Sequence, residues 1–250
     1  IFYEIIELNS DSKKISILDF GSGFQPYVIV HLQKKFRESD YETEITCVDL
    51  YSEDDLKELS KKYPSINFLN VKDLNYELKY DFSIISDVLH HMNINNKELI
   101  NKTLNDLGSL SNLVIVKDHF ESNSVNRVLL RIMDYFGNSF NKVYIPTKYF
   151  SKYEFEMILD ECGLEVESRI RNIKLYQWYV LFFNNPKYQF IYTLKKVNYT
   201  GDLAKDRNAV RDAIASTKDF KGSIKPCSLC DLYSGYFLYI LEHFFSFLGQ

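Results

Sequence analysis

Polar residues follow five successive apolar runs of the chain, and their types are suited to ligand binding and proton transfer. The first group is Asp19, Gly21 and Gly23, which come where the apolar run 15–20 ends. Glycine adopts positive φ without strain and leaves room for a ligand against the backbone. The next four runs end in Asp49; in Asp73 and Leu74; in Ser86, Asp87, His90 and His91; and in Lys117, Asp118 and His119. A tight turn explains one such group, whereas five in order predict a binding site for a nucleotide-like ligand.

The elements that must position these residues are alternating strands and helices. Short runs rich in Ile, Val, Leu and Phe, each followed by a segment of helical period, are typical of βαβ units and a parallel sheet. In such a sheet the carboxyl ends of the strands form one ligand-binding edge. The predicted strands are 15–20, 44–49, 66–71, 81–86, 112–118, 164–171 and 175–183, with helices near 26–37, 53–62, 96–107, 124–137 and 151–163.

The two later helices carry recognisable end residues. Ser151 and Glu154 form a capping box, and Gly163 ends that helix. Ser124 is the candidate N-cap of the preceding helix, and Gly137 ends it. We expect this helix to turn one apolar side inward, formed by Val125, Val128, Leu129, Ile132, Met133 and Phe136.

Composition narrows the class of protein. The 250-residue chain has a formal net charge of −4 and no arginine-rich stripe, so we expect no nucleic-acid partner. Four cysteines at this length do not make a disulfide framework. The first 14 residues have acids inside their apolar run and no small-residue cleavage site, which argues against a signal peptide. A cytoplasmic location is therefore expected.

Residues 186–250 differ in character from the rest. The part 184–208 is predicted to be an extended arm and loop, followed by a short helix that begins near Asp206. Cys227 and Cys230 lack a second ligand pair at zinc spacing, so no metal site is predicted. The aromatic segment 229–248 is about as long as a membrane span but is interrupted by Gly235, Glu242 and His243, and it has one apolar helical face. Three roles stay open for it: packing on the domain, contact in a homodimer, or contact with a membrane surface.

Five motifs taken together resemble a known family. In order they are ILDFGSG, CVDLY, FLNVKDLN, YDFSIISDVLHHM and LVIVKDHF, and this set is similar to the class I methyltransferases that use S-adenosylmethionine. The resemblance covers about 15–185 and implies a Rossmann-like, doubly wound α/β sheet of seven strands, mostly parallel, with the last strand antiparallel. It further implies a methyltransferase domain over 1–185 with a helical insert at 120–150, which would act as a lid that selects the acceptor. A C-terminal helical extension of unknown role would occupy 186–250.

The resemblance also implies roles for the cofactor-binding residues. Asp19, Gly21 and Gly23 would surround the methionine part of S-adenosylmethionine. Asp49 would hold the ribose hydroxyls, and Leu50 would lie against the adenine. Four further residues would complete the pocket: Asp73 and Leu74 beside the adenine, and Ser86 with Asp87 lining the pocket below. Gln25 stands where the family often has a third glycine. An NAD site is less favoured, because its fingerprint needs glycine where this chain has Pro26.

Methyl transfer to a hydroxyl needs a base, and histidine suits that role at neutral pH. His119 is the preferred base, with Asp118 or Lys117 to orient it, and His91 is the second choice. His90 is expected to begin a helix and pack. Tyr149 could close over the substrate, although a packed tyrosine is the commoner role. The predicted reaction is methyl transfer to a small molecule, with oxygen favoured as the acceptor atom. A non-catalytic cofactor-binding module and a membrane-associated methyltransferase of a lipid or quinone-like acceptor are the alternatives.

Overall fold

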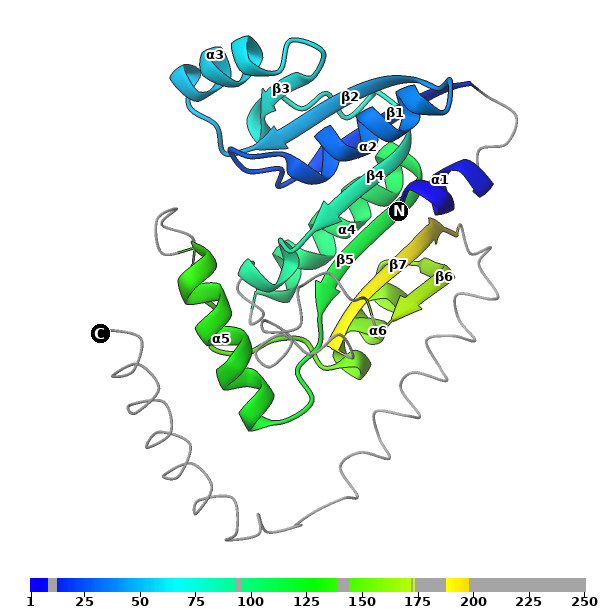
Figure 1. The fold of residues 1–250 in the computed structure, drawn as a ribbon. Coiled ribbons are helices and arrows are strands. Elements are labelled where there is room, and N and C mark those ends of the chain that lie inside the picture. Colours follow the sequence, from blue (N-terminus) through cyan, green and yellow to red (C-terminus); the bar gives the residue numbers. More distant parts are fainter. Residues whose placement is uncertain (9–12, 93–95, 139–143, 172, 174–187, 198–250) are drawn as a thin grey trace, which may run out of the picture. The chain divides into compact units, whose positions relative to one another are not determined.

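The centre of the fold is a seven-stranded sheet in the order β3-β2-β1-β4-β5-β7-β6 (Figure 1). The computed structural model describes residues 1–8, 13–92, 96–138, 144–171, 173 and 188–197, and residues 1–198 form one compact unit. Neighbouring strands pair in parallel except where β7 is involved, since β7 runs antiparallel to both β5 and β6. The strands are β1 Lys14–Phe20, β2 Glu42–Asp49, β3 Asn67–Asn70, β4 Tyr80–Ser86, β5 Ser111–His119, β6 Leu164–Arg171 and β7 Gln189–Lys196.

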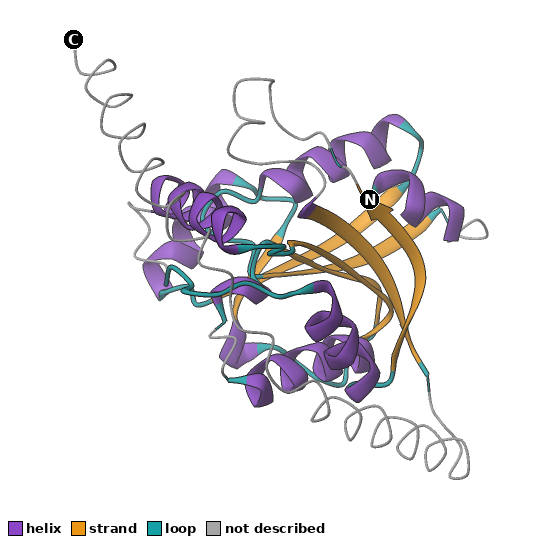
Figure 2. Ribbon diagram, turned by 90° about the horizontal axis from the view of Figure 1, so that it is seen from below, coloured by secondary structure: helices purple, strands orange, loops and turns teal. Residues whose placement is uncertain are grey.

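Helices cover both faces of the sheet (Figure 2). On one face, α1, α2 and α3 pack in a core that contains Ile17; on the other, α4 and α6 pack in a core that contains Leu18. Successive strand residues point to opposite faces, so each buried strand supplies both cores and is apolar throughout. The helices are α1 Phe2–Leu8, α2 Tyr27–Glu38, α3 Glu53–Lys62, α4 Lys97–Leu110, α5 Ser124–Asn138 and α6 Lys152–Glu161, with short 3-10 turns η1 Val71–Asp73 and η2 Leu89–His91.

The predicted fold class is confirmed, namely a Rossmann-like sheet of seven strands with the last one antiparallel. The capping box of Ser151 and Glu154 is present at the start of α6. Gly163 has φ +61° after that helix, as a glycine stop requires. The helical insert after β5 is also present as α5, at the end of the sheet toward which β4 and β5 point (Figure 1).

The prediction of an extended arm over 184–208 is wrong for part of that segment. The segment 189–196, expected to lie in an extended arm, forms β7 and pairs with β5 and β6. The sheet therefore continues past 185, the predicted end of the methyltransferase domain, and takes up the first part of the predicted extension. The expected strand 175–183 lies outside the described residues, which omit 174–187. The part of the predicted helical extension over 198–250 also lies outside them.

Helix α5 packs with a different side from the one predicted. Val125 and Val128 are 55% and 42% exposed, whereas Asn126, Leu130 and Asp134 are buried. These three residues recur every four positions, so they share one face of the helix. The cap is also displaced by one residue, because Asn123 rather than Ser124 accepts a hydrogen bond from the Asn126 backbone N–H. The buried face of α5 thus brings polar side chains toward the ends of the strands.

A further question is whether any helix could cross a membrane. Across the ranges given above, no helix is both long and apolar enough to cross a bilayer. The segment 229–248, whose possible roles are packing on the domain, contact in a homodimer or contact with a membrane surface, lies outside those ranges.

Candidate functional site

The loop after β1 is held in an open conformation by the end of β2. Gly21 and Gly23 have φ of +79° and +63°, which side-chain-bearing residues rarely adopt. The Gly21 N–H donates to the Val48 carbonyl at 2.7 Å, and the Gly23 N–H donates to Asp49 Oδ2 at 2.8 Å. The Tyr51 hydroxyl donates to the Gly23 carbonyl at 2.7 Å. A Cβ built on Gly23 would meet no atom within 4 Å, so this part of the loop faces open space.

Asp49 organises this loop through both oxygens of its carboxylate. Oδ2 accepts from the Gly23 N–H, and Oδ1 accepts from the Leu50 N–H at 2.7 Å. A carboxylate has about four lone-pair sites, so two acceptor positions remain for a ligand. The Leu50 side chain beside it is 77% exposed, which is unusual for leucine and leaves an apolar surface next to the carboxylate.

The remaining residues predicted around an adenine are placed differently from one another. Asp73 is exposed at the end of η1, while Leu74 is 5% exposed and belongs to the hydrophobic core. Ser86 and Asp87 lie at the end of β4 and are half-buried. The structure thus brings the Asp19 loop, Asp49 and the end of β4 to one edge of the sheet, with Leu74 below the surface.

Asp19 is a buried carboxyl at this edge. It is 5% exposed, and its position in β1 lies between Cys47 of β2 and Ile84 of β4. Burial, and then the nearby charge of Asp49, raise the pKa of Asp19 to about 7. Its carboxyl group therefore changes charge near neutral pH, directly below the glycine loop.

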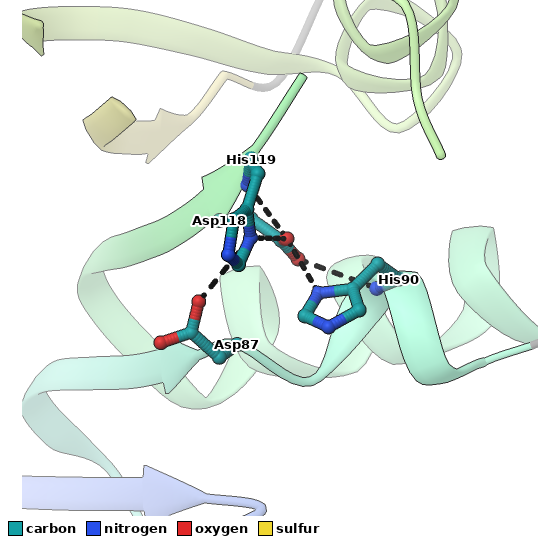
Figure 3. Close-up of side chains that lie close together, drawn as sticks. All are labelled: Asp87, His90, Asp118 and His119. Carbon is teal, nitrogen blue, oxygen red and sulfur yellow. Dashed lines mark hydrogen bonds and ion pairs between the residues drawn. The ribbon is translucent and has the colours of Figure 1, made fainter. Parts of the chain in front are cut away.

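A second group of polar residues lies at the ends of β4 and β5, and Figure 3 shows its centre at Asp118. This carboxylate is fully buried. Its Oδ1 lies 2.6 Å from Nδ1 of His90 and 3.2 Å from Nδ1 of His119, and it also accepts from the His119 backbone N–H at 2.7 Å. Two histidine rings from different elements are thus oriented by one carboxylate.

Asp87 borders the same group and has a strained backbone. Its φ is +56°, a value that is uncommon for residues other than glycine. Its N–H donates to the Lys117 carbonyl at 2.8 Å, and its carboxylate is paired with the Lys117 ammonium. Its Oδ1 lies 3.4 Å from His119 Nδ1. Such strain persists where surrounding contacts enforce it and is concentrated at functional sites.

Helix α5 closes the group from the far side. Asp134 Oδ2 lies 3.6 Å from His90 Nε2 and accepts a hydrogen bond from the Tyr149 hydroxyl. Tyr149 is fully buried, so it is a packed residue rather than an open lid. The half-buried His91 places Nδ1 2.8 Å from the Tyr144 carbonyl, and its ring centroid is 4.0 Å from that of His90.

The charges in this group stabilise one another. Burial by itself would lower the pKa of His90, but the carboxylates of Asp118 and Asp134 raise it to about 10. Burial would raise the pKa of Asp118, yet the attraction of His90 and the bonds from His119 hold it well below its usual range. The pKa of Asp134 is likewise lowered, against burial, by His90. Burial, together with the neighbouring Asp134, raises the pKa of Tyr149 above its ordinary value. Burial and the adjacent His90 lower the pKa of His91.

The arrangement leaves one nitrogen of His119 suited to accept a proton. Its Nδ1 is directed at Asp118 and Asp87, so in the neutral ring that nitrogen carries the hydrogen. Nε2 then holds the lone pair. A carboxylate behind Nδ1 also stabilises the imidazolium that forms when Nε2 takes a proton.

The structure unites most of the predicted catalytic residues and adds others. Lys117, Asp118, His119 and His91 lie in one group, as expected from their positions at the end of β5 and after β4. His90 is buried, as predicted, but both its ring nitrogens face carboxylates. Asp134 is absent from the residues predicted for the site. The one feature of the sequence that could have indicated it is the four-residue spacing of Asn126, Leu130 and Asp134.

Comparisons with known proteins show which fold this is. No protein-family model matches the chain, and neither does any curated protein. A structure of LepI in complex with SAM is similar with a TM-score of 0.54 and 12% identity, covering 78% of this chain and 46% of LepI. The chain thus spans about half the length of that protein. The 1,6-didemethyltoxoflavin-N1-methyltransferase of Burkholderia thailandensis, crystallised with S-adenosylhomocysteine, has a TM-score of 0.50 and 14% identity over 79% of this chain and 76% of its own.

A similar fold also occurs in a structure that is not described as a methyltransferase. A structure from Rhodobacter sphaeroides, described as a putative Zn-dependent alcohol dehydrogenase, has a TM-score of 0.50 and 10% identity over 78% of this chain and 90% of its own. Identities this low concern the fold alone. The function must therefore be argued from the residues of the site.

Proposed function

We propose that the chain is a methyltransferase that moves a methyl group from S-adenosylmethionine to a small-molecule acceptor, with oxygen favoured as the acceptor atom. One observation carries the proposal. The glycine loop after β1 and the histidine group after β4 adjoin, because Gly21 faces Val88, which lies between Asp87 and His90. A cofactor on the loop would hold its reactive end beside a base.

The residues present fit S-adenosylmethionine. The open space at Gly23 leaves room for a ligand along the loop, and Asp49 has unused acceptor positions for ribose hydroxyls. The exposed Leu50 offers an apolar surface for the adenine, with Asp73 at its border. Asp19, Gly21 and Gly23 would surround the methionine group, and Ser86 with Asp87 would line the pocket below. These roles agree with the resemblance to class I methyltransferases and with similar folds solved with SAM or S-adenosylhomocysteine.

His119 is proposed as the general base. When bound, the cofactor supplies a methyl group on a sulfonium, which an oxygen can take in an in-line displacement. Nε2 of His119 accepts the proton of the acceptor hydroxyl as that oxygen forms its bond to carbon. The carbon–sulfur bond breaks, and its electron pair stays on sulfur. Asp118 stabilises the resulting imidazolium through Nδ1, and Asp87, which is paired with Lys117, faces the same nitrogen.

The test measures cofactor binding first and methyl transfer second. Calorimetric titration of the protein with S-adenosylmethionine should show binding, and incubation with methyl-labelled cofactor and a metabolite extract should give a labelled product. Binding without any labelled product would favour the non-catalytic module, for which Gln25 in place of a third glycine is the relevant departure. Absence of binding would overturn the proposal. Liposomes and extracted lipids in the same assay would reveal a lipid acceptor.

A further inference from the structure

We propose that His90, His91 and Asp134 form a site for a divalent transition-metal ion such as Zn²⁺. One ligand atom from each of the three residues lies within 4.8 Å of the others. The site has the composition of two histidines and one carboxylate, which suits imidazole-binding metals rather than Mg²⁺ or Ca²⁺. Metal binding by these residues does not depend on the proposed methyl transfer.

The first argument is a buried nitrogen without a partner. His90 is 1% exposed, and among the described residues no hydrogen-bond partner reaches its Nε2. Figure 3 shows this nitrogen on the side of the ring that points away from Asp118. Buried polar atoms are almost always satisfied, so an exception calls for an explanation such as a bound ion.

The second argument is that both histidines have the tautomer that a metal ligand needs. His90 Nδ1 lies 2.6 Å from Asp118 Oδ1, and His91 Nδ1 lies 2.8 Å from the Tyr144 carbonyl. A carbonyl accepts only from N–H, and a carboxylate favours the same arrangement, so the hydrogen of each neutral ring lies on Nδ1. His91 then has its lone pair on Nε2, whereas in His90, whose raised pKa favours the protonated ring, the metal must displace the Nε2 proton. Metal-binding histidines typically donate their other N–H to a carboxylate or backbone carbonyl in this way.

The third argument is the spacing and support of the carboxylate. His90 Nε2 and Asp134 Oδ2 are 3.6 Å apart. Two ligands of a tetrahedral zinc ion, each at about 2.0–2.2 Å, lie about 3.4 Å from one another. The Tyr149 hydroxyl donates to Asp134, so the carboxylate is oriented as well. Each of the three ligands therefore has an outer partner.

A neighbouring group of Asp87, His90, Asp118 and His119 is also compact, but it is less suited to a metal. The Lys117 ammonium is paired with Asp87 and would repel a cation there. The Nδ1 atoms of His90 and His119 are both directed at Asp118. Asp118 is therefore occupied by bonds within that group, and the Lys117 ammonium already neutralises Asp87, whose Oδ1 makes no hydrogen bond to the described residues.

Three protein ligands leave coordination positions open for water or for another molecule. If the proposed function holds, an oxygen of the methyl acceptor could take such a position, close to His119 across the His90 ring. The ring centroids of His90 and His119 are 5.0 Å apart. Only this role, and not metal binding, rests on the proposed methyl transfer.

The experiment uses the full chain after removal of metals with a chelator. Titration with Zn²⁺ by calorimetry should show one site, and Co²⁺ should give visible absorption bands typical of nitrogen and oxygen ligation. His91→Ala and Asp134→Asn should each weaken Zn²⁺ binding by more than about a hundredfold, since even outer partners contribute about 10–100-fold. Circular dichroism and thermal unfolding would verify that the variants fold.

Matched controls separate this site from others. His31→Ala changes an exposed histidine on α2, His119→Ala tests the neighbouring group, and a Cys227→Ser, Cys230→Ser double variant tests the thiols. All three should retain the Co²⁺ spectrum. No Co²⁺ or Zn²⁺ binding by the unaltered chain, or binding that is unchanged in His91→Ala, would overturn the proposal. Neither readout needs S-adenosylmethionine, so failure here is distinguishable from failure of the proposed function.

Discussion

Gly21 and Val88 lie so close that a side chain at position 21 would collide with the valine. A Cβ built on Gly21 would be 2.4 Å from Val88 Cγ2, far inside van der Waals contact. This approach joins the loop after β1 to the turn that carries Asp87 and His90. Glycine at this position is therefore required twice, once for its φ of +79° and once for the space.

Gly21→Ala should destabilise the protein more than Gly23→Ala does. Both changes place a Cβ on a residue with positive φ, but only position 21 adds a collision, because the space at Gly23 is open. Overpacking of this kind costs about 1–3 kcal/mol. Urea unfolding of the two variants would measure the difference. In a Gly21→Ala, Val88→Ala double variant the two effects should be less than additive, and strict additivity would contradict the contact.

Asp49→Ala should weaken S-adenosylmethionine binding far more than it lowers turnover at saturating cofactor. The change removes the acceptor for the Gly23 and Leu50 N–H groups as well as the proposed ribose ligand. Hydrogen bonds to a charged group contribute about 1.5–3 kcal/mol each, so the dissociation constant should rise by about 10–150-fold. Asp49→Asn keeps one acceptor oxygen and should be intermediate. Calorimetry would measure these constants, and unchanged affinity in Asp49→Ala would show that the ribose lies elsewhere.

The stability contributed by Asp19 should fall as pH rises. Its pKa is raised from 3.8 to about 7 in the folded protein, so between pH 4 and 7 the folded state holds a proton that the unfolded state has lost. Stability relative to Asp19→Asn should therefore decrease over that window by about 1.4 kcal/mol for each pH unit. Guanidinium unfolding of both proteins at several pH values would measure it. A relative stability that rises with pH would contradict the burial of this carboxyl.

The sheet was predictable because its strands are buried on both faces. Each parallel strand then reads as a short apolar run, and β1, β4 and β6 differ from prediction by at most one residue at either end. The prediction for the segment that forms β7 was wrong, because pairing rather than composition decides its structure. The segment 189–196 closely follows Pro186 and ends in two lysines, and it becomes a strand by pairing with β5 and β6. Pairing is a contact between distant parts of the chain, so local composition does not reveal it.

The site residues at strand ends could be predicted from the sequence, whereas the site residue on helix α5 could not. Asp49, Asp87, Asp118 and His119 follow strands, and sheet topology alone brings them together. Asp134 reaches the site because α5 turns its Asn126 and Leu130 face inward while Val125 and Val128 stay exposed. The apolar pattern of α5 favours a neighbouring side, of which Leu129, Ile132 and Met133 are half-buried. Only the partners His90 and Tyr149, distant in sequence, account for the burial of this carboxylate.

His119→Ala should leave S-adenosylmethionine affinity intact and lower the rate of methyl transfer by about a hundredfold or more, as expected for loss of a general base. The ring lies at the end of β5 with Nδ1 on Asp118 and Asp87, so its loss also removes one partner of each carboxylate. Added imidazole separates the two effects. It should restore part of the rate if Nε2 takes the proton, and it should restore nothing if the ring only supports the fold. His31→Ala, on the exposed side of α2, should keep the full rate in the same assay. A His119→Ala rate equal to that of His31→Ala would move the role of base to His91, the half-buried histidine of the group.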